Sequence, residues 1–111
     1  MKCTITTREV EGVTIFDLVG RMSFPDPHLQ PLLGGQLKAG KTAVVINLAG
    51  VTYMDSYGLN DLVNAYNAIR AKGGKLVLLR PNHNVKKTIE ITMKQIFEFF
   101  DDEAAAIQAV R

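Results

Sequence analysis

The sequence predicts an α/β domain in which an antiparallel hairpin opens a mixed β-sheet and helices pack on that sheet. Two stretches of alternating side chains, 2–10 and 13–19, meet at the turn-forming pair Glu11–Gly12. Two nearly continuous apolar runs, 43–49 and 75–80, are typical of strands covered on both faces. Helical periodicity follows each run, and strands that alternate with helices favour parallel neighbours in the sheet.

The first elements follow from turn chemistry and leucine spacing. Gly12 supplies the positive φ that a two-residue hairpin turn requires. The stretch 20–40 is the least regular, because Pro25, Pro27 and Pro31 interrupt it. We expect a short, imperfect helix after the prolines, on the spacing of the leucines at positions 29, 32, 33 and 37.

The central strand and helix are more regular. We expect the strand at 43–49 to lead through a link, Gly50–Met54, into a helix over Tyr57–Ala71. Asp55 and Ser56 are both favourable N-cap residues. Gly73 and Gly74 close the helix. One apolar face is formed by Leu59, Leu62, Val63, Tyr66 and Ile69.

The C-terminal third contains the remaining elements. Pro81 stops the strand at 75–80, and Asn84 is the expected cap of a helix that carries Val85, Ile89, Met93 and Ile96. We expect a short strand at 97–100. The acidic run 101–103 then begins a last helix, where negative charge favours the positive end of the helix dipole.

Length, charge and cysteine content exclude several classes of protein. The 111 residues favour one domain, residues 1–111, and the net charge of +2 gives no electrostatic case for nucleic acid or anionic membrane. One cysteine and two histidines are too few for the usual zinc cage. The polar N-terminus and the lack of a long apolar run predict a cytoplasmic protein without membrane insertion. We expect neither a cofactor nor a metal.

One sequence pattern suggests nucleotide binding. The segment Gly35–Thr42 matches the phosphate-loop pattern G-x4-G-K-[ST]. A phosphate loop follows a strand and precedes a helix, so that backbone N–H groups surround the phosphates. Here a leucine-rich segment comes first and a strand-like run comes second. The sequence therefore favours a turn that leads into a strand, and a small nucleotide hydrolase is the lowest-ranked alternative.

A second pattern lies where the central strand leads into its helix. Ser56 would be exposed at a helix N-terminus, where a phosphate gains from free N–H groups and the helix dipole. Gly58 would keep a bulky side chain off the first turn and allow close approach of a partner. Ser56 is a poor catalytic nucleophile, because no histidine is nearby in sequence, although His28 or His83 could approach it in space.

The order of elements and the segment Asp55–Leu59 resemble the STAS domain, the fold of the bacterial anti-sigma-factor antagonists. A buried strand like 43–48 leads through Gly-Val-Thr-Tyr-Met into Asp-Ser-Tyr-Gly-Leu, and the phosphorylatable serine of the family falls on Ser56. The resemblance extends over nearly the whole chain, from the opening hairpin to the segment 97–110.

The resemblance implies a switch rather than an enzyme. In such systems the unmodified protein binds an anti-sigma factor that is a serine kinase, phosphorylation of the serine breaks the complex, and a phosphatase resets it. This chain would then be phosphorylated on Ser56 and regulate transcription by partner switching. The partner-binding residues that the resemblance and the expected exposure indicate are Ser23, Asp26, Asp55, Ser56, Tyr57, Gly58, Leu59, Asn60 and Asn64.

Two features keep alternatives open. Ser56 could be an N-cap that is never modified. Antagonists of the family often carry an acidic residue after the glycine that ends the second strand, whereas here Gly20 is followed by Arg21 and no acidic residue occurs before Asp26. The segment that follows is also rich in proline and glycine. The alternative function is therefore an unphosphorylated STAS subunit of a stressosome-like scaffold or of a lipid ABC transporter.

Overall fold

The computed structural model describes residues 3–23, 29–92 and 96–111. The α/β class and the order of elements agree with the sequence prediction. The strands are β1 Thr4–Val10, β2 Val13–Met22, β3 Ala43–Met54, β4 Lys75–Leu79 and β5 Phe99–Phe100. The helices are α1 Leu29–Lys38, α2 Ser56–Ala71, α3 His83–Thr92 and α4 Glu103–Val110.

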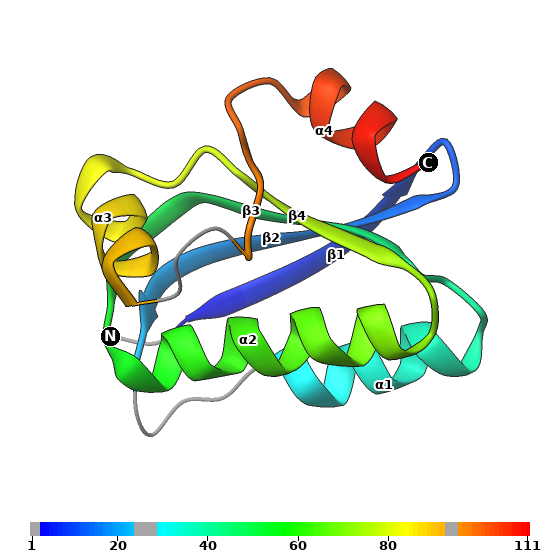
Figure 1. Cartoon of the computed structure of the whole chain (residues 1–111), viewed down its shortest axis with the longest axis horizontal. Coiled ribbons are helices and arrows are strands. Elements are labelled where there is room, and N and C mark those ends of the chain that lie inside the picture. Colours follow the sequence, from blue (N-terminus) through cyan, green and yellow to red (C-terminus); the bar gives the residue numbers. More distant parts are fainter. Residues whose placement is uncertain (1–2, 24–28, 93–95) are drawn as a thin grey trace.

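The five strands form one sheet in the order β1-β2-β3-β4-β5 (Figure 1). Only the pair β1–β2 is antiparallel, and the other three pairs are parallel. The hairpin turn places both Glu11 and Gly12 at positive φ, 52° and 81°. A type I′ turn has this conformation, and its twist matches that of the strands it joins.

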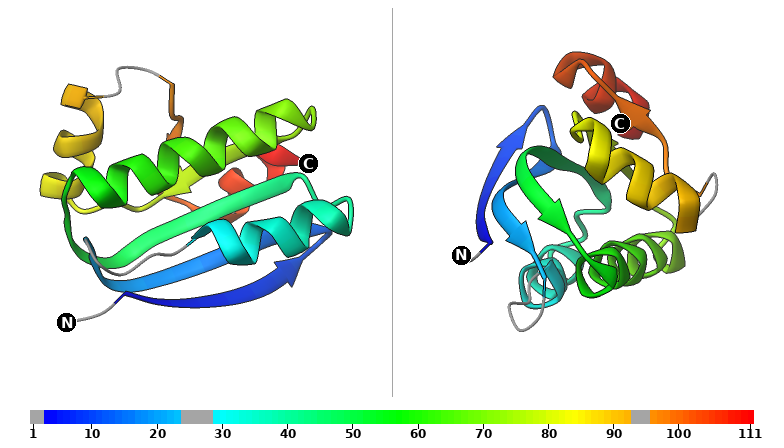
Figure 2. Two further views of the ribbon diagram at one scale, coloured as in Figure 1. Left: turned by 90° about the horizontal axis from the view of Figure 1, so that it is seen from below. Right: turned by 90° about the vertical axis from the view of Figure 1, so that its left-hand side faces the viewer.

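Helices cover both faces of the sheet, but unequally. Helices α1 and α2 lie together on one face and α4 lies on the other (Figure 2). The larger apolar core contains side chains of α1, α2 and α3, with Phe16, Leu18 and Ile46 from the strands. The smaller core lies under α4 and contains Ile15 and Val45. Toward the hairpin end, both faces of the central strands are therefore buried, as the apolar run 43–49 predicted.

The predicted link Gly50–Met54 was wrong, because β3 continues through it to Met54. Strand β2 also runs on to Met22, so the two strands pair over their whole C-terminal halves. The register shifts between Asp17 and Val19, and again between Gly20 and Arg21. Extra residues on β3 at these two points let the pair continue as a bulged ladder, which local sequence patterns do not reveal.

One helix cap differs from the sequence prediction. Asn82, and not Asn84, caps α3, because the Asn82 side chain accepts a hydrogen bond from the Val85 N–H at 2.8 Å. Of the two residues that the sequence offered as caps of α2, Asp55 is the cap, and the helix begins at Ser56 rather than at Tyr57. At α4, where the sequence predicted acidic residues at the start of the helix, Asp102 is the cap and accepts from the Ala105 N–H at 2.9 Å. The expected short strand at 97–100 is reduced to Phe99–Phe100.

Candidate functional site

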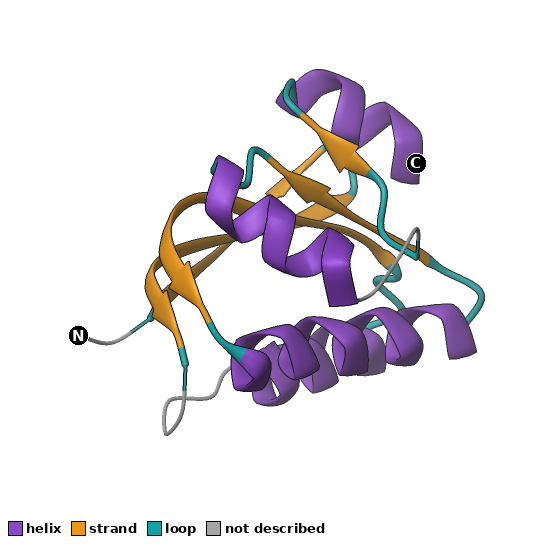
Figure 3. Ribbon diagram, turned by 60° about the vertical axis from the view of Figure 1, so that its left-hand side comes forward, coloured by secondary structure: helices purple, strands orange, loops and turns teal. Residues whose placement is uncertain are grey.

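The candidate site is the first turn of α2, which begins where β3 ends. Figure 3 shows the short loop that joins the end of this strand to the helix. Strand β2 is parallel to β3 and ends beside it, with Met22 paired to Met54. Functional sites of open α/β sheets gather outside the carboxyl ends of parallel strands. Ser56 lies at this end of the sheet as the first residue of α2, and it is exposed.

Asp55 organises the first turn of α2. Its Oδ1 accepts hydrogen bonds from the backbone N–H of Tyr57 at 2.9 Å and of Gly58 at 3.2 Å. These amides are among the N–H groups that have no partner within the helix. Asp55 is therefore the N-cap of α2, and the Ser56 side chain does not cap the helix. In the described part of the chain, no residue hydrogen-bonds to the Ser56 side chain.

Gly58 holds α2 against the end of β2. A Cβ atom at Gly58 would lie 2.3 Å from the Met22 carbonyl oxygen and 2.6 Å from the Met22 Cβ. The same carbonyl accepts a hydrogen bond from the Asp55 N–H at 3.2 Å. The space at Gly58 is thus filled by Met22 of the same chain, whereas the sequence suggested that a partner would use it. The close approach holds the first turn of α2, which begins with Ser56, against the end of β2.

The predicted partner-binding residues divide into exposed and buried sets. Tyr57 is 60% exposed, while Leu59 is buried in the larger core. Ser56, Asn60 and Asn64 are exposed and lie four residues apart, so they form one stripe along α2. Ser23 is half-buried just after β2. Asp26, and the loop that contains it, lie outside the described residues.

Asp61 is a structural residue of this region that the sequence analysis missed. Its Oδ2 accepts a hydrogen bond from the Leu29 N–H at 2.9 Å, so a side chain of α2 caps the first turn of α1. Asp61 therefore holds the beginning of α1 beside the second turn of α2. No local pattern could indicate this contact, because the two residues are 32 positions apart.

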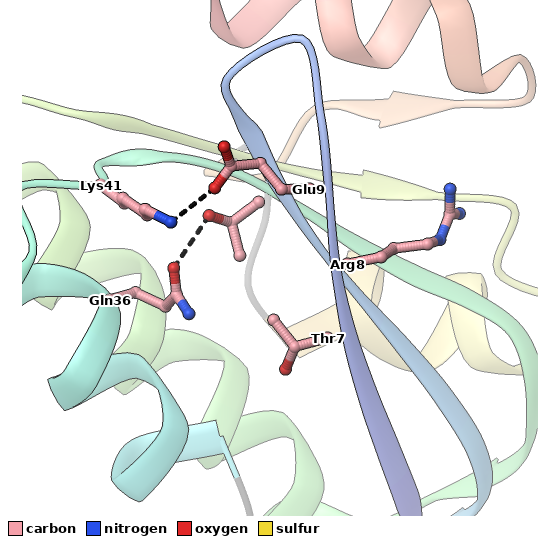
Figure 4. A pocket seen from close by; sticks show the side chains of 6 residues that line it. Thr7, Arg8, Glu9, Gln36 and Lys41 are labelled. Carbon is pink, nitrogen blue, oxygen red and sulfur yellow. Dashed lines mark hydrogen bonds and ion pairs between the residues drawn. The ribbon is translucent and has the colours of Figure 1, made fainter.

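The phosphate-loop pattern does not form a phosphate site. It begins within α1 and passes the C-terminal end of that helix, where carbonyl groups and not N–H groups are unpaired. Lys41 lies 2.5 Å from Glu9 Oε1 in an ion pair. Together with Gln36, these residues line a hollow of about 170 Å³ between β1 and α1 (Figure 4). The Thr14 hydroxyl, which is buried, donates to Gln36 Oε1 there at 3.0 Å. The pattern is thus a helix end and a turn into β3, as the sequence favoured.

The described residues were also compared with the requirements of a metal site and of a membrane-spanning helix. Among the residues that the structure describes, no three His, Cys, Asp or Glu side chains cluster closely enough to hold a metal ion. Across the same residues, no helix combines the length and apolar character that a membrane span requires.

The comparison with protein families decides the classification. The profile of the STAS domain matches residues 4–106. The chain belongs to the STAS domain family. A Thermotoga maritima protein named "Putative anti-sigma factor antagonist" is 29% identical over 76 residues, which are 68% of this chain and 67% of that protein.

Solved structures place the STAS fold over nearly the whole chain. An anti-sigma factor antagonist from Mycobacterium paratuberculosis superposes with a TM-score of 0.86 and 21% identity, covering 99% of this chain and 95% of the other. The Bacillus cell fate determinant SpoIIAA in its phosphorylated form gives a TM-score of 0.74 and 18% identity, with 97% of this chain and 100% of SpoIIAA covered. These likenesses confirm the fold predicted from the sequence.

Proposed function

We propose that this STAS domain is an anti-sigma factor antagonist that switches partners through phosphorylation of Ser56. Unmodified, it binds a serine-kinase anti-sigma factor in the cytoplasm. Once phosphorylated it releases that partner, and a phosphatase restores the unmodified form. The observation that carries the proposal is the placement of Ser56, exposed and without a described hydrogen-bond partner, at the first position of a firmly held helix.

The arrangement around Ser56 favours a switch that acts through charge. A phosphoserine carries about −1.5 to −2 charges at neutral pH. Asp55 already accepts from the Tyr57 and Gly58 amides, so these N–H groups are not available to neutralise the new charge. The phosphate would stand beside a carboxylate and face solvent or a partner. A partner packed on this turn would have to desolvate that charge, which weakens binding.

The exposed stripe of Ser56, Asn60 and Asn64 along α2 is part of the proposed contact surface. Asn60 and Asn64 extend the exposed face of Ser56 by two turns, and Tyr57 adds an aromatic ring beside it. Tyrosine is frequent among residues that dominate binding energy at protein interfaces. We include Asp55 and Ser23 at the edge of this surface, while Gly58 and Leu59 support it from below. Asp26 belongs to the proposal on sequence grounds alone.

The first test is phosphate transfer from the cognate kinase. The chain has two serines, Ser23 and Ser56. We expect the wild type to incorporate one phosphate and Ser56→Ala to incorporate none, as measured by intact-protein mass spectrometry, and fragmentation of the wild-type protein should place the phosphate on Ser56 and not on Ser23. Equal incorporation into Ser56→Ala and the wild type would refute the switch.

The second test identifies the partner. Wild-type and Ser56→Asp proteins serve as baits for affinity capture from the native cytoplasm. A kinase-type protein bound by the wild type and absent from Ser56→Asp supports the proposal. A transporter ATPase or a large scaffold bound equally by both baits would replace it with the alternative function of an unphosphorylated binding subunit.

A further inference from the structure

On the face of the sheet that carries α4, described residues far from the hairpin are more exposed than those under the helix. Helix α4 lies near the hairpin end, while the beginning of α2 lies at the opposite end (Figure 1). Val13 and Ile15 of β2 are buried under α4, but Val19 is 54% exposed. Alternation along the strand places Val19 and Arg21 on the same face as Ile15. Tyr53 of β3 is paired with Arg21 and is 42% exposed.

The backbone beneath this surface is closely fitted. A Cβ atom at Gly50 would lie 2.8 Å from Val19 Cγ2 and 2.9 Å from the Leu18 carbonyl oxygen. The Val19 side chain therefore lies over a position that must be glycine. The Thr52 hydroxyl donates to the Gly20 carbonyl at 3.2 Å, which pins the second bulge of β3. Bulges of this kind re-aim side chains, and here one places Tyr53 beside Arg21.

Arg21 stacks on a tyrosine and has no carboxylate partner among the described residues, unlike Arg8 and Arg111. Its guanidinium carbon lies 4.1 Å from the centroid of the Tyr53 ring. Arg8 and Arg111, by contrast, form ion pairs with carboxylates of the chain. No such pair to Arg21 is present in the described ranges, which end at Ser23 and resume at Leu29. Stacking engages the face of the guanidinium and leaves its in-plane N–H donors for an acceptor, and a carboxylate fits that fork in a bidentate manner.

We propose that Val19, Arg21 and Tyr53 form a second part of the partner interface, in which Arg21 binds a carboxylate of the anti-sigma factor. The inference rests on the proposed function, because the patch adjoins the Ser56 turn: Tyr53 precedes Asp55 by two residues, and the Asp55 N–H bonds to Met22, next to Arg21. The carboxylate of an Asp or Glu side chain bonds to the guanidinium edge. An apolar side chain beside it covers Val19 and the Tyr53 ring.

The charge of the patch favours a protein carboxylate over a phosphate backbone. On β1, Thr4 pairs with Val19 and Thr6 pairs with Asp17. Both threonines are exposed and uncharged. Nucleic-acid binding depends on several lysines and arginines that each release counterions. Of the three residues that define the patch, Val19, Arg21 and Tyr53, only Arg21 carries a charge, and the chain as a whole has a net charge of +2. One carboxylate is the acceptor that matches one stacked arginine.

The test measures affinity for the kinase-type anti-sigma factor by isothermal titration calorimetry. Arg70→Gln is the matched control, since Arg70 also stacks on a tyrosine, Tyr66, at 5.8 Å, near the opposite end of α2. We expect Arg21→Gln to weaken binding about tenfold or more, and Arg21→Lys to recover only part of the loss because it lacks the fork. Arg70→Gln should bind within about twofold of the wild type.

The outcomes separate this inference from the proposed function. Binding by Arg21→Gln within twofold of the wild type overturns the inference, and so does an equal loss in Arg21→Gln and Arg70→Gln. Ser56→Asp is measured in the same series. If Ser56→Asp binds like the wild type, phosphorylation switching fails, while the Arg21 variants still report on the patch.

Discussion

Gly58 is the residue on which the geometry of the Ser56 turn depends. A methyl group there would meet the Met22 carbonyl oxygen at 2.3 Å, a distance that real Cβ atoms essentially never show. Because the opposing atom belongs to the backbone, the first turn of α2 must move away from β2. We predict that Gly58→Ala lowers the free energy of unfolding by about 1–3 kcal/mol, a typical cost of overpacking. Urea unfolding followed by circular dichroism measures the change.

Gly34 offers the matched control within the same chain. It lies in α1, and a Cβ atom there would have no heavy atom within 4 Å. Alanine is favoured over glycine inside helices by about 1 kcal/mol, so Gly34→Ala is expected to stabilise the protein slightly. A Gly58→Ala protein as stable as Gly34→Ala would contradict the close approach of α2 to β2.

At the scale of elements, β3 shows what local patterns can and cannot predict. The apolar run 43–49 identifies a buried strand because both of its faces are covered. The extension from Gly50 to Met54 contains exposed Thr52 and Tyr53, and its pairing with β2 is interrupted by register shifts. Sequence patterns alone predict a loop for such a segment, because its strand character depends on pairing with β2. The sequence therefore predicted the order of the elements correctly but ended this strand too early.

The candidate site likewise contains features that the sequence predicted and contacts that it did not. The sequence placed Ser56 at the beginning of α2, because helix caps and apolar periodicity are local signals. It did not reveal that Met22 fills the space at Gly58, or that Asp61 caps α1. Both contacts join segments that are about 30 or more positions apart, and only the folded chain brings them together.

Arg8 joins the hairpin to α4 and couples stability to pH. Its guanidinium bonds to Asp17 at 2.6 Å and to Glu103 at 2.6 Å. These hydrogen bonds lower the pKa of Asp17 and of Glu103 below their ordinary values of 3.8 and 4.5, and they raise the pKa of Arg8. A carboxyl whose pKa is lower in the folded state stabilises the fold above its unfolded pKa. This stability is lost as the pH falls through the folded pKa.

We therefore predict that Arg8→Met reduces the acid sensitivity of the fold. At pH 7 the variant should be less stable than the wild type by about 1 kcal/mol, because the three side chains are only partly buried. From about pH 4.5 downwards the difference should shrink as both carboxyls become protonated. Urea unfolding at pH 7 and at pH 3 gives the comparison. A stability difference that is the same at both pH values would exclude this role for Arg8.

Over the whole molecule, the groups that stabilise the hairpin end are separate from the Ser56 turn. Arg8 and Glu103 connect β1 to α4, which lies toward the hairpin (Figure 1). The Ser56 turn lies at the carboxyl ends of β2 and β3 and is held by Asp55, Gly58 and Met22. A charge added at Ser56 therefore acts first on whatever contacts that end of the sheet.

This separation predicts that phosphorylation changes binding without changing the fold. Ser56 is exposed, and the Tyr57 and Gly58 amides are bonded to Asp55, so among the described residues a new charge breaks no hydrogen bond of the Ser56 side chain. We expect Ser56→Asp to unfold within about 0.5 kcal/mol of the wild type, as surface substitutions usually do. Its amide NMR shifts should change only around the beginning of α2 and the neighbouring strand ends. Shifts spread through α4 and the hairpin would mean instead that the charge acts by rearranging the domain.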